Sequence, residues 1–446
     1  MSPWSSPPLS ETATALCTIL ILLVPFSVAG VALLNTGLNR SRSAAQTMLA
    51  SLSIVGVAAI TYFVVGFAVQ GLAGQPEHSL SISGKAWGWI GAERLFLRGV
   101  KFDGSRLSLV AWFQLMSVGL AAVIPFGAGS DRWRLGPSLA STALFAGWTY
   151  PLFAHWVWGG GWLVQLGANY GLGRGFLDAG GSSCIQVSGG LTALSMAWIL
   201  GPRRGKYSPD GMTAAIPGHN AVIAVFGCLL ALVGWLALNS AGAILFSNAE
   251  IGRVALVAIN TTLCAAAAGL TTAAVTSVRL GKPDASLTAN GWIGGLAASS
   301  AACAFILPAA AVIVGMIAGI LVPFAVELFE LRLAVDDPGG AISAHGVAGL
   351  WGVLAAGIFS SSAVTSNTLS GSGSGQLLAQ VIGMATLLGL VLPMTYGLNW
   401  SLNRIHPQRV AGEGEWQGMD LHELGAGAYP EFVTHREDSF QRWSKS

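Results

Sequence analysis

Residues 336–352 read Asp-Asp-Pro-Gly-Gly-Ala-Ile-Ser-Ala-His-Gly-Val-Ala-Gly-Leu-Trp-Gly. After the two aspartates, about 20 residues carry no charge unless His345 is protonated, and a run of that length spans a bilayer. An ionisable side chain inside such a run is costly, so it normally faces a pathway or a partner and not lipid. His345 is therefore the first candidate for a functional residue. The alternative is a structural histidine that is bonded to a backbone carbonyl.

The whole chain has the composition of a polytopic helical membrane protein. Of its 446 residues, 53% are hydrophobic and 9% are charged, whereas a soluble protein carries about 25% charged residues. The 59 glycines favour close contacts between membrane helices. No basic cluster indicates nucleic-acid binding. The five cysteines lie in apolar runs without metal-ligand spacing, so we expect neither disulfides nor a metal site, and no cofactor motif is evident.

Eleven apolar runs predict an all-α membrane domain over residues 12–403. They are 12–34, 46–72, 105–128, 136–158, 181–200, 218–246, 252–278, 287–306, 307–331, 342–361 and 376–402. Basic residues gather in every second connection, as at Arg40, Arg132 and Arg203, and in the tail. Because positively charged loops stay on the cytoplasmic side, we expect the N-terminal residues 1–11 outside and the tail 404–446 in the cytoplasm.

A short internal similarity links the fifth and tenth runs. Residues 186–191 read Gln-Val-Ser-Gly-Gly-Leu, and residues 345–350 read His-Gly-Val-Ala-Gly-Leu. Both begin with a polar residue and end in Gly-Leu at the same offset. Two halves of five spans each would be inverted relative to one another in the membrane, so we expect a 5+5 inverted repeat followed by an eleventh helix.

Several separate motifs together resemble the ammonium transporter family (Amt/Mep/Rh). They recur in the family's order and are Ala154-His155-Trp156-Val157-Trp158-Gly159-Gly160-Gly161, Pro217-Gly218-His219-Asn220, Gly234-Trp235 with Asn239, Asn260-Thr261, Gly281-Lys282-Pro283, Asn290-Gly291, and Asp336-Asp337-Pro338 through His345-Gly346. The resemblance runs from about residue 12 to about residue 430. It implies an eleven-helix bundle, a homotrimer with one pore in each subunit, and passage of ammonium or ammonia.

The family resemblance also shows where this chain departs from the pattern. The paired pore histidines of the family fall at Gln186 and His345, so only the second imidazole is kept. The two gate phenylalanines match Ser117 and Leu238, and the serine of the cation-recruitment site matches Gly242. We therefore expect a pore that is wider on its outer side and discriminates less strongly against other small solutes.

Trp158 and Asp178 are the two matched residues near the outer mouth. Trp158 is expected to offer its ring face to the cation, a contact worth about 0.5–2 kcal/mol depending on desolvation, although tryptophans are also common at span ends as interface anchors. Asp178 immediately precedes the fifth run, so we expect its carboxylate to cap that helix and to support the cation site without direct contact.

These features predict a transporter of the bacterial inner membrane and not an enzyme. Two alternatives remain open: an ammonium sensor on a poorly conducting scaffold, and a channel for another small neutral solute. The tail segment Glu415-Trp416-Gln417-Gly418-Met419-Asp420-Leu421-His422-Glu423 resembles the family's cytoplasmic tail. In relatives that segment couples subunits and can bind a PII-type regulatory protein, which makes such a protein a candidate partner here.

Overall fold

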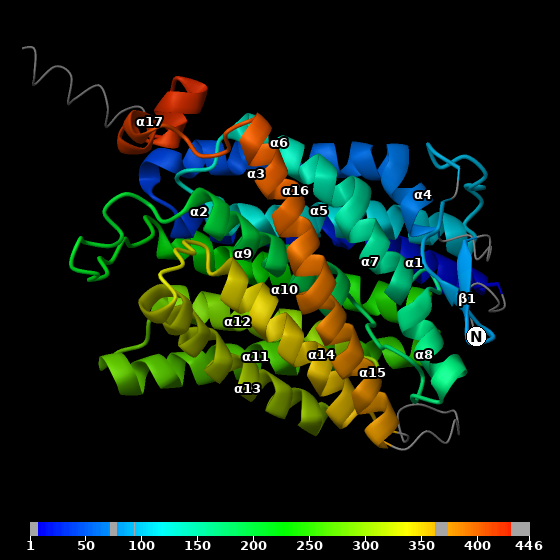
Figure 1. The fold of residues 1–446 in the computed structure, drawn as a ribbon. Helices are drawn as coiled ribbons and strands as arrows, with labels where there is room; N and C mark the ends of the chain where they lie inside the picture. The colour runs from blue at the N-terminus through cyan, green and yellow to red at the C-terminus, as the bar shows by residue number, and fades with distance from the viewer. Residues whose placement is uncertain (1–7, 72–77, 93, 362–372, 430–446) are drawn as a thin grey trace, which may run out of the picture.

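The described residues, 8–71, 78–92, 94–361 and 373–429 of a computed structural model, form a bundle of long helices (Figure 1). Helix fills each of the eleven predicted runs. The predicted all-α class is therefore confirmed. The departures from helix among these residues are loops and one small hairpin, and both lie at the ends of the bundle.

The first five helical runs form the first half of the bundle. Several of them contain a π-helical turn, in which the backbone accommodates one extra residue. In order, they are α1 (Glu11–Leu23) with α2 (Pro25–Leu38); α3 (Ala44–Thr61) with a π turn (Tyr62–Gly66) and α4 (Phe67–Gln70); α5 (Arg106–Gly129); α6 (Leu135–Leu144), a π turn (Phe145–Thr149) and α7 (Tyr150–Val157); and a π turn (Ser182–Val187) with α9 (Ser188–Leu200).

The next five runs form the second half, and one more follows them. They are α10 (Ala221–Ser247); α11 (Val254–Leu280); α12 (Ala285–Ala302); α13 (Pro308–Glu327) with a π turn (Leu328–Arg332); a π turn (Ile342–Val347) with α14 (Ala348–Phe359); and α15 (Gly373–Thr386), a π turn (Leu387–Val391) and α16 (Leu392–Ile405). Corresponding pairs pack together in the two halves, since α5 contacts α9 as α12 contacts α14.

Nine helical runs among the described residues are long and apolar enough to cross a membrane. The other two predicted runs, 136–158 and 287–306, coincide with the helices over residues 135–157 and with α12. Helix α12 is rich in Gly, Ala and Ser, and it is covered by α11, α13 and α14. A helix that contacts other helices on most sides does not need the strongly apolar surface of a lipid-facing one.

The two halves meet where α2 crosses α10, and glycines make this crossing close. A Cβ atom at Gly30 would lie 2.5 Å from the backbone nitrogen of Ala231, and one at Gly227 would lie 2.6 Å from the carbonyl oxygen of Gly30. Any side chain at either position would force the helix backbones apart. The high glycine content thus has the packing role that was predicted for it.

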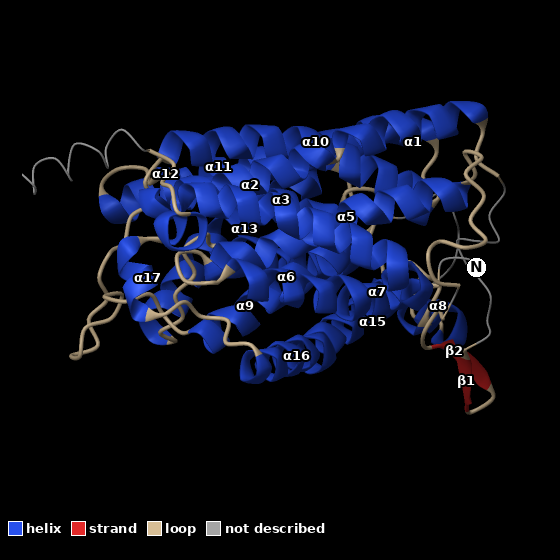
Figure 2. Ribbon diagram, turned by 90° about the horizontal axis from the view of Figure 1, so that it is seen from above, coloured by secondary structure: helices blue, strands red, loops and turns tan. Residues whose placement is uncertain are grey.

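Short elements distinguish the two ends of the bundle, as Figure 2 shows. One end carries the hairpin of β1 (Ser79–Ile82) and β2 (Lys85–Gly88), paired antiparallel, together with α8 (Trp162–Tyr170). The other end carries α17 (Gly412–Gln417), a π turn (Asp420–Leu424) and the 3₁₀ turn Ser41–Ser43. A second 3₁₀ turn, Ile251–Arg253, precedes α11. The hairpin lies in the long loop 73–104, for which no strand was predicted.

Candidate functional site

Two π-helical turns bring the predicted central residues together. Gln186 lies in the turn Ser182–Val187 that leads into α9, and His345 lies in the turn Ile342–Val347 that leads into α14. Single π turns inside α-helices frequently occur at functional sites. The second turn lies close to the start of α9, because a Cβ atom at Gly190 would lie 2.4 Å from the backbone nitrogen of Gly346. Only a glycine at position 190 allows this approach.

His345 and Gln186 form a buried hydrogen-bonded pair. The distance between His345 Nδ1 and Gln186 Oε1 is 2.7 Å, and both side chains are buried. Because a side-chain carbonyl oxygen only accepts, the proton lies on Nδ1 in this arrangement and the ring keeps a lone pair at Nε2. Within the part of the chain that the structure describes, the Gln186 Nε2 amide has no hydrogen-bond partner. The His345 Nε2 lone pair and the Gln186 Nε2 amide are therefore available for hydrogen bonds to a small polar molecule in an apolar interior.

Asp178 caps the first of the two turns, as predicted. Its carboxylate accepts hydrogen bonds from the backbone N–H groups of residues 181, 182, 183 and 184 and from the Ser183 hydroxyl. Burial nevertheless raises the pKa of Asp178, because desolvation outweighs the hydrogen bonds that lower it. The carboxylate oxygens point into the turn, so the capping role accounts for this residue without a direct ligand contact.

Trp158 follows α7 and is held in a fixed orientation. Its indole Nε1 donates to the Asp178 carbonyl oxygen at 2.7 Å, and its side chain is only 1% exposed. Phe246, from the last turn of α10, stacks on it with ring centroids 4.6 Å apart and planes 9° apart. Phe113 from α5 meets both rings edge-on, at 6.2 Å from Trp158 and 5.6 Å from Phe246. Phe246 is the partly exposed member of this aromatic trio.

The residues that replace the family's gate and recruitment side chains are all buried. Ser117 and Leu238 have no exposed surface, and the Ser117 hydroxyl and the Gln114 Nε2 amide make no hydrogen bond to another described group. Close packing explains the glycine at position 242, because a Cβ atom there would lie 2.3 Å from the Ala179 carbonyl oxygen. The absence of a hydroxyl side chain at position 242 therefore accompanies a closer approach of α10 to the segment that precedes the first π turn.

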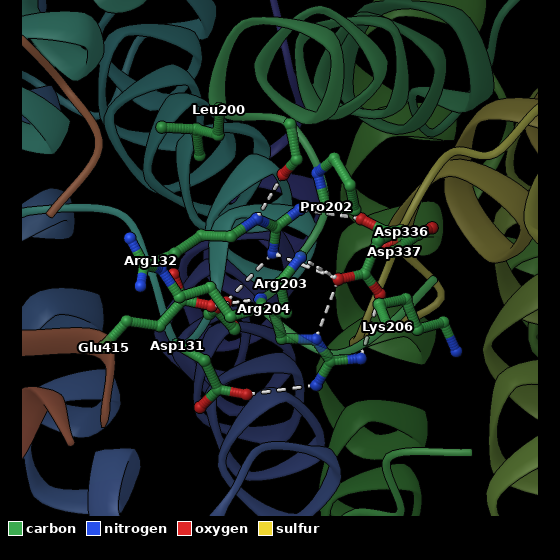
Figure 3. A network of polar contacts seen from close by, with 12 residues as sticks. Asp131, Arg132, Leu200, Pro202, Arg203, Arg204, Lys206, Asp336, Asp337 and Glu415 are labelled. Atoms are coloured by element: carbon green, nitrogen blue, oxygen red, sulfur yellow. Dashed lines mark hydrogen bonds and ion pairs between the residues drawn. The ribbon is translucent and has the colours of Figure 1, made fainter. Parts of the chain in front are cut away.

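An ionic network closes the opposite end of the bundle (Figure 3). Arg203 binds Asp336 with its Nε at 2.9 Å and Asp131 with its Nη1 at 3.1 Å, and Arg132 donates to the Asp336 carbonyl oxygen at 2.8 Å. These four residues are buried. The nearby guanidinium groups outweigh burial and hold the pKa of Asp336 well below its usual range, whereas burial lowers the pKa of Arg132 to about 10.

Asp337 differs from its neighbour Asp336, since it caps the second π turn. Its carboxylate accepts from the backbone N–H groups of Ala341 at 3.0 Å and Ile342 at 2.7 Å. Burial raises the pKa of Asp337 to about 6, and the charge of Asp336 adds to this shift. Asp336, one residue earlier, caps no turn and instead forms buried ion pairs with Arg132 and Arg203.

The tail segment packs against the same end of its own chain. Glu415 accepts from the backbone N–H of Arg204 at 2.6 Å and from Arg409 at 2.9 Å. Asp420 accepts from the backbone N–H groups of Ala45 and Gln46, at 3.2 and 2.7 Å. The tail therefore caps the start of α3 and reinforces the loop that carries Arg203. Among the described residues, His, Cys, Asp and Glu nowhere gather in threes that could hold a metal ion.

Sequence reasoning missed two features of this site. Phe246 was not singled out, although it lies four residues after Gly242 and eight after Leu238, a spacing that places all three on one face of α10. The buried network of Arg132, Arg203 and Asp336 was seen only as loop charges. Its members are far apart in the chain, so their pairing depends on the tertiary fold.

Comparisons with known proteins agree on one family. The family model described as "Ammonium Transporter Family" matches residues 15–429. Ammonium transporter Amt2 of Archaeoglobus fulgidus is 37% identical over 92% of this chain and 86% of its own length, and the ammonium transporter of Bacillus subtilis is 32% identical over 92% and 96%. The solved structure of a "Sensor Amt Protein" matches with a TM-score of 0.82 and 28% identity, over 92% of this chain and 98% of that chain. The structure of Mep2 of Candida albicans matches with a TM-score of 0.79 and 26% identity, over 95% of this chain and 91% of that chain.

Proposed function

The chain belongs to the ammonium transporter family and transports ammonium or ammonia across a membrane, and we propose that the substrate passes along the line from Trp158 to His345. The observation that carries the proposal is the buried pair of His345 and Gln186, where the two π turns meet. Both side chains offer polar atoms inside an otherwise apolar interior, and such groups within membrane helices usually mark a transport pathway.

Ammonium and ammonia face different costs along this line. Moving a cation from water into an apolar interior has a large unfavourable desolvation free energy, whereas that of neutral ammonia is much smaller. Trp158, held by Asp178, serves as the outer cation site through its ring face. The substrate then releases its proton to water at the outer mouth and crosses as ammonia, with the His345 lone pair and the amide of Gln186 as its hydrogen-bonding contacts. Leu238, Ser117 and Gly242 line the outer part of the path.

Gln186 determines whether net charge crosses the membrane with the transported ammonia. An amide does not titrate at physiological pH, so a proton cannot pass between two imidazoles as it can where both positions are histidine. We therefore propose electroneutral or weakly electrogenic transport. The Ser117 hydroxyl, which takes the place of a gate phenylalanine, supports hydration of the outer part and weaker discrimination among small solutes.

The proposed setting is a homotrimer in the bacterial inner membrane, with the N-terminus outside and the tail in the cytoplasm. The buried network of Arg132 and Arg203 and the docked tail share one end of the bundle, and positively charged ends face the cytoplasm. The exposed tail residue Trp416 and its neighbours offer a surface for a PII-type regulatory protein. No step of this function requires catalysis by the protein.

Growth on limiting ammonium tests the proposal. A strain without its own ammonium transporters should grow when it expresses this chain, and His345→Ala should reduce that rescue. His78→Ala is the matched control, because His78 is exposed in the loop before β1 and should rescue like the wild type. Absence of rescue by a wild-type protein that is folded and membrane-inserted would contradict the proposal.

Purified protein separates transport from its alternatives. Liposomes that contain the protein should take up ammonia faster than empty liposomes, and methylamine and urea measure discrimination. Binding of ammonium without uptake would identify a sensor instead, and uptake of urea without ammonia would identify a channel for another solute.

A further inference from the structure

The Trp158 ring is not open to an incoming cation in this structure. It is 1% exposed, and Phe246 covers one of its faces almost in parallel at 4.6 Å. We infer that Phe246 is a movable outer gate that must leave the Trp158 ring before the cation can bind there, and that it thereby determines which amines enter. This inference rests on the proposed role of Trp158 as the outer cation site.

The position of Phe246 explains how the chain keeps an aromatic constriction after losing others. Leu238, Gly242 and Phe246 follow one another at intervals of four residues on one face of α10. Gly242 has no room for a side chain, because the Ala179 carbonyl oxygen lies where its Cβ would be. The next residue outward on this face is Phe246, and its ring fills the space over Trp158. The constriction has therefore shifted toward the outer end of the bundle.

Of the three rings, Phe246 alone has the freedom to move. Trp158 is fixed by its hydrogen bond to the Asp178 carbonyl oxygen, and Phe113 is completely buried. Phe246 is partly exposed, and α10 ends one residue later at Ser247. Rotamer changes of exposed side chains are fast, so the partly exposed Phe246 is the ring of the three that is placed to rotate.

The backbone beneath Phe246 is held in place. Arg106 donates through Nη1 to the carbonyl oxygens of Ile244 at 3.3 Å and Leu245 at 2.8 Å. These contacts tie the last turn of α10 to the start of α5, the helix that also carries Phe113. The opening movement is therefore a rotation of the Phe246 ring and not an unwinding of the helix.

A hinged aromatic ring selects by size. When the ring rotates, a small cation can take its place on the Trp158 face, since a cation–π contact replaces the lost ring stacking. A larger amine needs a wider opening, which the edge-on ring of Phe113 limits. Removal of the Phe246 ring should therefore help methylammonium more than ammonium.

Two substitutions and one control test the gate in proteoliposomes. Phe246→Ala removes the ring, and Phe246→Leu keeps an apolar side chain but removes the aromatic face. Phe226→Ala is the matched control, because Phe226 lies on the same helix and is 53% exposed on its outer surface. The uptake rates of ammonium and of methylammonium are measured for each protein.

We expect Phe246→Ala to raise methylammonium uptake about fivefold relative to wild type, the factor that corresponds to the loss of a ring-stacking contact. Ammonium uptake should rise less, so the ratio of the two rates should shift. Phe246→Leu should shift the ratio in the same direction, and Phe226→Ala should leave it unchanged. An unchanged ratio in both Phe246 variants, with active wild-type protein, would overturn the gate and leave the transport proposal intact.

Equilibrium binding covers the case in which the wild-type protein does not transport. Ammonium chloride should then raise the unfolding temperature of detergent-solubilised Phe246→Ala at lower concentration than it does for wild type, because no ring has to be displaced. The same ammonium dependence in both proteins would overturn the gate. Tighter apparent binding without any uptake would support the gate and contradict the transport proposal.

Discussion

The two π turns at Ser182–Val187 and Ile342–Val347 share one construction and differ in the side chain that they present. Each is capped by an aspartate that stands eight residues before the central polar residue, Asp178 before Gln186 and Asp337 before His345. The first aspartate accepts from four backbone N–H groups and a hydroxyl, and the second from two backbone N–H groups.

The difference teaches that backbone geometry and chemistry are set separately in the two halves. Both turns need a cap and a close glycine contact, because their unpaired N–H groups would otherwise be buried without partners. Neither requirement determines which side chain points into the interior, so glutamine and histidine occupy equivalent positions in the two turns. The surroundings also differ, since the Trp158 and Phe246 rings lie near the first turn, whereas the second turn has the Trp235 ring beside His345 and an ionic network before it. Four measurements test this comparison.

The largest effect is expected from removal of the caps. Asp178→Ala leaves four backbone N–H groups without their acceptor and should lower the free energy of unfolding by about 3 kcal/mol or more. Asp337→Ala leaves two and should cost about half as much. Unfolding of the detergent-solubilised protein, followed by circular dichroism, measures both. Equal losses would show that the two caps are equivalent.

The glycine contact between α9 and the second π turn should be asymmetric. A Cβ atom at Gly190 would lie 2.4 Å from the Gly346 nitrogen, whereas a Cβ atom at Gly346 would find its nearest neighbour at 3.6 Å, in Gly190. Gly190→Ala should therefore cost about 2 kcal/mol through overpacking. Gly346→Ala is the matched control and should stay within about 0.5 kcal/mol of wild type. Unfolding of the detergent-solubilised protein measures both changes. A larger loss of unfolding free energy for Gly346→Ala than for Gly190→Ala would contradict the observed contact.

Asp337 should make stability fall as the pH rises through mildly acidic values. Its folded pKa of about 6 lies above the ordinary value of 3.8 for an aspartate, so the folded state binds the proton more tightly. Stability is therefore highest below about pH 4 for this group and decreases up to about pH 6, by up to about 2 kcal/mol for a partly buried carboxyl. Asp337→Asn should flatten the profile. Asp178, whose pKa is also raised, contributes in the same direction in both proteins, so an unchanged slope in Asp337→Asn would exclude Asp337 as its source.

A second imidazole should change the charge that moves with the substrate. Gln186→His restores a titratable group opposite His345 and should raise ammonium-induced currents on a solid-supported membrane about tenfold or more, because proton transfer between positioned groups becomes available. The wild type should give small currents despite measurable uptake. Currents of ordinary size in the wild type that persist in Gln186→Ala would contradict weakly electrogenic transport.

Much of the fold and part of the site were predictable from local patterns. The uncharged run around His345 predicted a buried polar residue, and Asp178 was correctly assigned as the cap of the next helix. The contact between His345 and Gln186 followed from the family resemblance and is present at 2.7 Å. The ring of Phe246 over Trp158 was not predicted, because stacking joins two spans that are far apart in the chain.

The amino-acid sequence by itself determined the positions of the helical runs, the burial of His345 and the family, since apolar length and motif order are local properties. Only the tertiary structure decided that Gly242 is needed for close packing, that Asp336 joins two buried arginines, and that Phe246 covers Trp158. Each of these depends on a distance between segments more than 60 residues apart in the chain or on the angle at which two helices cross. Such distances are fixed by the summed packing of the bundle, and no single stretch of residues encodes them.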